Sequence, residues 1–117
     1  MPPADYLPLT PAVLHILLAL AGGDRHGYAI AQEVESLTDG RVRMGPGTLY
    51  GSIERMDEGG LLERAPRRDH DDPGDERRVY YRLTRLGERV LELELERLNA
   101  VVELGRERHV FQRPEPA

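Results

Sequence analysis

Hydrophobic positions in the first sixty residues predict three helices. After Thr10-Pro11, apolar residues recur every three or four positions up to Leu20, and the same spacing returns over 26–37 and over 46–58. A threonine cap followed by proline is typical of a helix start. Gly45-Pro46 marks the start of the third helix by the same proline rule, and Gly59-Gly60 marks its end. The first helix has two neighbouring apolar stripes, so we expect it to be buried on more than one side.

The second half of the chain predicts a hairpin and a long helix. Residues 61–67 and 78–83 have the composition of strands, and the Asp-Asp-Pro-Gly-Asp sequence between them suits only a turn or loop. Thr84 then caps a helix whose leucines and valines continue to Leu104, before a proline-containing tail. This order is the layout of a winged helix-turn-helix. We expect a mainly α fold with a two-stranded β wing and a long C-terminal helix.

The chain length suits one hydrophobic core. Because a winged helix-turn-helix is a DNA-binding fold, we expect a winged helix-turn-helix DNA-binding domain over 9–83, a C-terminal dimerisation helix over 84–109 and a flexible tail over 110–117. Late in the long helix, apolar residues follow the four-three-four spacing of a coiled coil, and an exposed stripe of this kind favours a homodimer. The residues expected at the dimer interface are Leu14, Leu18, Leu91, Leu95, Leu98 and Val102.

Charge and cysteine content narrow the class of protein. The net charge of -5 argues at first against nucleic acid as a partner. The sixteen basic residues are all arginines, however, and ten of them lie between residues 41 and 85. The absence of cysteine excludes disulfides and thiol chemistry and fits a reducing compartment. The longest apolar run, 12–21, is too short to span a bilayer, and the first residues do not resemble a signal peptide. We expect a cytoplasmic protein.

The helix over 46–58 is the candidate for recognition of DNA. In helix-turn-helix proteins the later helix of the pair enters the major groove and presents its outward N-terminal side chains to the bases. Small residues at its start, Gly47, Thr48 and Ser52, would allow a close approach, and Arg55 is long enough to reach a guanine or a phosphate. From these residues alone, a surface helix that merely tolerates small residues is an equal alternative.

Three motifs taken together resemble the PadR family of transcriptional regulators. They are His26-Gly27-Tyr28, the run from Gly45 to Tyr50, and the run from Arg78 to Thr84 followed by Gly87. The resemblance implies a homodimeric repressor whose two recognition helices enter successive major grooves of a pseudo-palindromic operator, with release by a signal that differs among members. It also favours a DNA contact for Tyr50. Gly51 departs from the family pattern, in which many members have proline.

The tip of the predicted wing carries five acids between Asp69 and Glu76, which DNA would repel. The arginines that flank this loop either neutralise it internally or bind phosphates, and the sequence leaves both alternatives open. The residues expected to contact DNA are Arg43, Gly47, Thr48, Tyr50, Ser52, Arg55, Arg67, Arg68 and Arg78.

No motif for catalysis is present. The sequence has no nucleophile elbow, phosphate loop or zinc-protease motif, and His70 with its aspartate neighbours lacks the fixed geometry of a metal site. We expect no enzyme activity and no cofactor. The main alternative to a DNA-binding regulator is a winged-helix module that docks a protein through its hairpin or long helix. A small-molecule effector, bound between the long helices and the first helix, is compatible with both interpretations and is not identified by the sequence.

Overall fold

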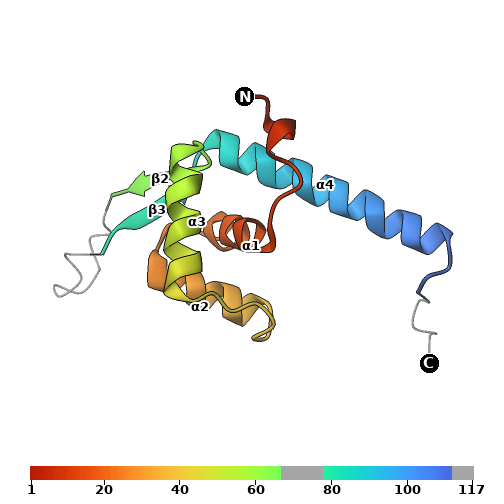
Figure 1. The fold of residues 1–117 in the computed structure, drawn as a ribbon, viewed down its shortest axis with the longest axis horizontal. Coiled ribbons are helices and arrows are strands. Elements are labelled where there is room, and N and C mark those ends of the chain that lie inside the picture. Colours follow the sequence, from red (N-terminus) through yellow and green to blue (C-terminus); the bar gives the residue numbers. More distant parts are fainter. Residues whose placement is uncertain (67–77, 112–117) are drawn as a thin grey trace.

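The computed structural model describes residues 1–66 and 78–111 of the chain. Three helices pack with a small sheet, and a longer fourth helix extends away from this body (Figure 1). The elements in chain order are the 3-10 helix η1 (Pro3–Tyr6), α1 (Pro11–Ala21), β1 (Arg25–His26), α2 (Gly27–Leu37), α3 (Pro46–Glu58), β2 (Leu62–Ala65), β3 (Tyr80–Leu83) and α4 (Arg85–Glu107). The predicted winged-helix fold class is therefore confirmed, with η1 and β1 added to it.

The helices begin at the predicted residues for the predicted reasons. The Thr10 side chain accepts a hydrogen bond from the Val13 N–H at 3.2 Å, and Pro11 occupies the first helical position of α1. The helix α3 likewise has proline, Pro46, at its first position, directly after Gly45. These signals lie within one helical turn of the helix start, so they can be predicted without knowledge of the tertiary structure.

The predicted two-stranded hairpin is present as β2 and β3, and β1 adds a third strand to it. The strands are antiparallel in the order β1-β3-β2, and Arg25 and His26 pair with Tyr81 and Tyr80. β1 contains two residues, too few to show the alternation of a strand, and its pairing depends on a segment far along the chain. β2 and β3 are also shorter than predicted, and the acidic wing tip lies outside the described residues.

The helix α1 lies at the centre of the molecule and contacts α2, α3, α4 and β3. Ile16 and Leu17 are fully buried, while Leu14 and Leu18 are half-buried, as expected for a helix with two apolar stripes. The buried core consists of Ile16, Leu17, Ala19, Leu20, Ile30, Val34, Leu49, Ile53, Met56, Leu61, Leu62, Val90 and Leu91.

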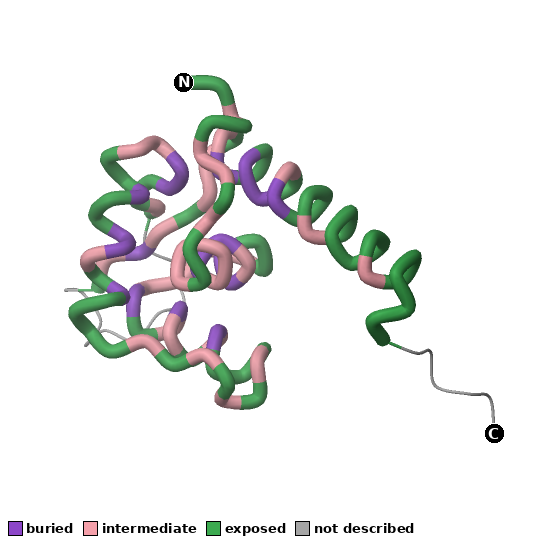
Figure 2. The backbone as a smooth tube through the Cα atoms, turned by 45° about the vertical axis from the view of Figure 1, so that its right-hand side comes forward, coloured by how far each residue is buried: buried purple, intermediate pink, exposed green. Residues whose placement is uncertain are grey.

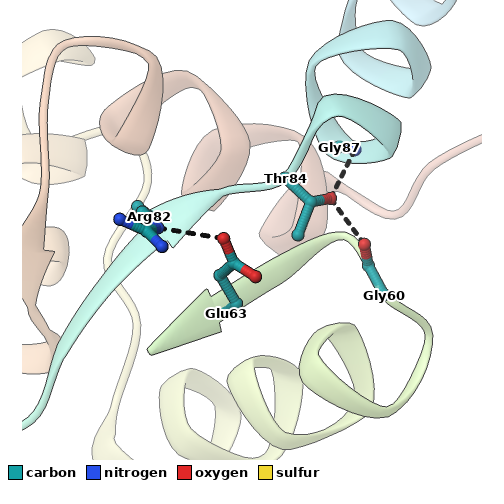
Figure 3. A network of polar contacts seen from close by, with 5 residues as sticks. All are labelled: Gly60, Glu63, Arg82, Thr84 and Gly87. Carbon is teal, nitrogen blue, oxygen red and sulfur yellow. Dashed lines mark hydrogen bonds and ion pairs between the residues drawn. The ribbon is translucent and has the colours of Figure 1, made fainter. Parts of the chain in front are cut away.

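Thr84 joins the start of α4 to the segment that follows α3 (Figure 3). Its hydroxyl donates to the Gly60 carbonyl at 2.5 Å and accepts from the Gly87 N–H at 3.0 Å. Its backbone N–H donates to the Leu61 carbonyl at 3.2 Å. A Cβ atom on Gly87 would lie 1.9 Å from the Leu61 carbonyl oxygen, so only glycine fits this close approach.

Residues 1–10, which we call the N-terminal strap, cross α4 and reach the end of α3 (Figure 1). The Tyr6 hydroxyl donates to the Gly59 carbonyl at 2.6 Å, and the Leu9 N–H donates to the Glu94 carboxylate at 2.6 Å. Glu94 is only 1% exposed and also accepts a hydrogen bond from Arg97. This bond lowers the pKa of Glu94, against the opposing effect of burial. The strap could not be predicted from the sequence, because its contacts with Gly59 and Glu94 join residues 53 and 85 positions apart.

The second half of α4 projects into solvent (Figure 2). Leu91 is 7% exposed and belongs to the core of this chain, so its assignment to an exposed dimer stripe was wrong. It lies where α4 still covers α1 and β3, which the heptad spacing alone could not reveal. Beyond it, Leu95 and Val102 are 43% and 41% exposed, and Leu98 is half-buried. None of the described helices combines the length and apolarity needed to cross a membrane.

Candidate nucleic-acid interface

The helix α3 buries one side and presents the other to solvent. Leu49, Ile53 and Met56 face the core, and Gly47 and Thr48 are exposed as predicted. Around Gly47 a Cβ atom would meet nothing within 4 Å, so the start of the helix is open on this side. The N-terminal half of α3 can therefore approach another surface closely.

Ser52 is 1% exposed, so its prediction as an outward residue was wrong. It lies beside the core residue Ile53 and follows Leu49 by one helical turn, which turns its side chain inward. Its hydroxyl accepts a long hydrogen bond, 3.4 Å, from the guanidinium of Arg55. Ser52 therefore supports the position of an exposed arginine and does not itself face a partner.

The motif His26-Gly27-Tyr28 forms a compact joint between α2, α3 and the sheet. The His26 Nδ1 atom accepts from the Ala29 N–H at 3.1 Å and so caps α2, while Nε2 lies 3.0 Å from Arg78 Nη1. The imidazole stacks against Tyr28 with centroids 6.5 Å apart. The contact between His26 and Arg78 joins residues that are 52 positions apart in the chain, so no local pattern predicts it.

Gly27 allows Tyr50 to lie directly on the first turn of α2. A Cβ atom at Gly27 would be 2.6 Å from the Tyr50 ring, closer than packing permits. Tyr50 is nevertheless 50% exposed, and Tyr28 beside it is 62% exposed. The two motifs that contain these tyrosines are therefore neighbours in the fold. Both phenol groups are exposed near the start of α3.

A cavity of about 290 Å³ lies at this joint. Its lining combines hydroxyl groups with an arginine, a set of donors that suits an anionic group such as a phosphate. The Tyr81 hydroxyl is a protonated donor at neutral pH, since its ordinary pKa is 10.0 and burial raises it further. The lining residues are His26, Gly27, Tyr28, Tyr50, Arg78, Val79 and Tyr81.

The predicted arginines lie in different surroundings. Arg43 is in the segment just before α3, where its Nε is 3.5 Å from Glu35 in a mainly exposed ion pair. Arg55 is exposed on α3, and Arg78 is exposed at the base of the wing. Arg67 and Arg68, like the acidic wing tip and His70, lie outside the described residues. Within the described part of the chain, no group of three potential metal ligands occurs.

Comparison with known proteins agrees with this architecture. The chain matches the model of the transcriptional regulator PadR-like family over residues 13–93. It is 36% identical over 76 residues to an uncharacterised protein of Lysinibacillus sphaericus, which covers 65% of this chain and 67% of that protein.

Two solved structures share the fold. A PadR family transcription regulator from Clostridium difficile matches with a TM-score of 0.67 at 21% identity, over 84% of this chain and 97% of its own. The hsRosR-S4 complex matches with a TM-score of 0.65 at 27% identity, over 83% of this chain and 76% of its own. Because the family model covers more than half of the sequence, this chain belongs to the PadR-like family of transcriptional regulators, whose members are not enzymes.

Proposed function

We propose that this PadR-like regulator binds double-stranded DNA in a sequence-specific manner, as a cytoplasmic homodimer that represses transcription. The proposal is supported by one exposed surface. This surface consists of the N-terminal half of α3 and the 290 Å³ cavity beside it, which Tyr28, Tyr50 and Arg78 help to line. A helix with an open N-terminal half suits the major groove, and the cavity supplies hydroxyl and guanidinium donors for the adjacent backbone phosphates.

The residues proposed at the interface have two roles. Gly47, Thr48 and Arg55 on α3 face the bases, and Tyr50 and Arg78 hold a phosphate at the joint with α2. Arg43, in the segment that leads into α3, adds a further backbone contact, which requires it to leave its exposed pairing with Glu35. Arg67 and Arg68 remain proposed phosphate contacts on the strength of the sequence alone.

The dimer is proposed on the exposed apolar residues of α4. Leu95, Leu98 and Val102, which we call the α4 stripe, follow the spacing of a coiled coil on a helix that projects from the body. Leu14 and Leu18 of α1 are half-buried and complete the proposed interface. A two-fold dimer of this kind presents two copies of α3 to a pseudo-palindromic operator.

A cavity of about 620 Å³ between α1, β3 and α4 is the proposed effector site. Its volume lies in the range of small-molecule sites, and its apolar walls include Leu20, Leu91 and Leu95. Because Leu95 also belongs to the α4 stripe, an occupant there is placed to alter how two α4 helices meet. This offers a route from a small molecule to the separation of the recognition helices.

DNA binding is tested by fluorescence anisotropy with a labelled duplex from the upstream region of the gene and a scrambled duplex, over a series of salt concentrations. We expect preferential binding that weakens with salt, a loss of about tenfold in affinity with reduced specificity for Arg55→Ala, and a smaller salt slope for Arg43→Ala. Arg108→Ala, which removes the same charge at the far end of α4, is the matched control and leaves specificity unchanged.

If neither this duplex nor any from a genome-wide fragment selection binds at low salt, the DNA-binding proposal is wrong. The alternative, a winged-helix module that docks a protein, would then be favoured, in keeping with the net charge of -5.

A further inference from the structure

The solvent-facing side of α3 carries an exposed glutamate, Glu54. Gly47, Gly51, Glu54 and Glu58 are spaced four, three and four residues apart, so they lie along one line of the helix. This line is opposite Leu49, Ile53 and Met56, which are buried. Since the first two positions have no side chain, Glu54 is the first group on this line that can extend toward a partner.

The fold gives no reason for Glu54. Among the described residues, no hydrogen bond or ion pair holds its carboxylate, and the neighbouring Arg55 guanidinium is directed to Ser52. Glu58 lies four residues further along the helix, so the two carboxylates repel each other. Glu58 also lies in the last turn of α3, where the helix dipole disfavours negative charge. Within the described chain, Glu54 therefore has a neighbouring acid and no stabilising partner, which leaves its carboxylate available to a binding partner.

A carboxylate in the major groove is compatible with few bases. Guanine presents two acceptors there and thymine presents one acceptor with a methyl group, so both repel it or give it no donor. Adenine offers an amino donor beside the N7 acceptor, which faces the second carboxylate oxygen. Cytosine offers its N4 amino donor with no neighbouring acceptor on the same base edge. A glutamate at the reading surface is thus complementary to cytosine above the other bases.

We propose that Glu54 is a specificity-determining residue of α3 that accepts a hydrogen bond from the N4 amino group of a cytosine in each half-site of the operator. The inference rests on the proposed DNA binding and deepens it, because it names one base at one position. Glu54 selects mainly by exclusion: its charge weakens binding to every duplex that lacks the amino donor at that position.

The test combines selection from random duplexes with anisotropy titrations of the full chain. Four proteins are compared: wild type, Glu54→Ala, Glu54→Gln and Glu58→Gln. The last variant removes the same charge from the final turn of the same helix and is the matched control. Because Glu54 is exposed and unpaired within the described chain, all variants are expected to fold, which circular dichroism checks.

We expect the wild type to select one cytosine per half-site and to lose about tenfold in affinity when that base is replaced. Glu54→Ala should bind many duplexes more tightly and lose this preference. Glu54→Gln should shift the preference at the same position toward adenine, since a glutamine amide pairs with the adenine N6 and N7 atoms. Glu58→Gln should keep the cytosine preference.

The outcomes separate this inference from the proposed function. If the wild type selects a clear motif that Glu54→Ala leaves unchanged at every position, the role of Glu54 is overturned while DNA binding stands. If the wild type selects no motif at all, the proposed function itself fails, and the inference fails with it.

Discussion

At the scale of single residues, two glycines make the contacts that hold the domain together. The structure has no room for a Cβ atom at Gly27, where the Tyr50 ring lies on α2, or at Gly87, where α4 meets the Leu61 carbonyl. Both glycines belong to the motifs on which the family resemblance rests. Their role is close approach between elements, and neither requires an unusual backbone conformation because both lie within helices.

Gly87→Ala is expected to destabilise the fold by about 3 kcal/mol, because its Cβ would collide with backbone and the start of α4 must move. Urea denaturation measures the loss. Gly47→Ala is the control, since its Cβ would meet nothing within 4 Å, and it should leave stability unchanged or slightly higher. Equal stability of the Gly87 variant and the wild type would contradict the close contact at α4.

Gly51→Ala is expected to stabilise the protein by about 0.5–1 kcal/mol, since alanine loses less backbone entropy in a helix. The nearest atom to its Cβ would be Arg55 Nη1 at 3.5 Å, an ordinary contact. The same denaturation experiment measures the gain. A loss of stability would show that the helix at this point depends on an unfilled space.

At the scale of elements, the N-terminal strap ties α3 to α4. Tyr6 bonds to the carbonyl that follows α3, and Leu9 bonds to the buried carboxylate of Glu94 on α4. The strap therefore restrains the angle between these two helices from a part of the sequence outside both of them. A buried carboxylate is stable here because the Leu9 N–H and the Arg97 guanidinium satisfy its oxygens.

Glu94→Gln is expected to lower the melting temperature at neutral pH by about 5 °C, because the amide pairs less well with Arg97. The Glu94 pKa is lowered in the folded state, so its contribution is complete above its ordinary pKa and is lost as the pH falls through the folded value. The difference between wild type and variant should therefore shrink as the pH falls below 4.5, the ordinary pKa of glutamate. Thermal melts across this range measure it.

The control for this experiment is Glu92→Gln, which removes an exposed carboxylate paired with Arg89. It should change the melting temperature little at any pH. A difference between Glu94→Gln and the wild type that stays constant down to pH 3 would mean that the Glu94 charge does not stabilise the fold.

At the scale of the whole molecule, the long α4 helix leaves apolar side chains exposed on a single chain. Its second half projects from the body (Figure 2). In the α4 stripe Leu95 and Val102 are exposed and Leu98 is half-buried, and such a surface is stabilised when a second copy covers it. The proposed function requires this second copy, because one chain presents a single α3 helix.

Leu98→Glu is expected to convert the proposed dimer to a monomer and to weaken operator binding by more than tenfold, because the charge would be buried in the interface. Sedimentation velocity gives the mass in solution, and anisotropy gives the affinity. Ala100→Glu, on the opposite side of α4, is the control and should remain dimeric. A dimer that survives Leu98→Glu would place the interface elsewhere.

The sequence by itself determined the elements whose signals are local. Threonine caps, proline at the first helical position and three- to four-residue apolar spacing placed α1, α3 and α4, and the motifs around Gly27, Tyr50 and Gly87 indicated the family. These features lie within a turn or two of each other, so one segment carries all the information needed to predict them. The exposed start of α3, at Gly47 and Thr48, was predicted for the same reason.

Only the tertiary structure decided which of the positions predicted at the surface are exposed to solvent. The packing of α1 and the sheet turned Ser52 and Leu91 into the core, brought β1 against β3, joined His26 to Arg78, and buried Glu94 beneath the strap. Each of these contacts joins residues far apart in the chain or depends on where a helix leaves the body. Periodicity gives the side of a helix that is apolar, but it does not give the length over which a neighbouring element covers that side.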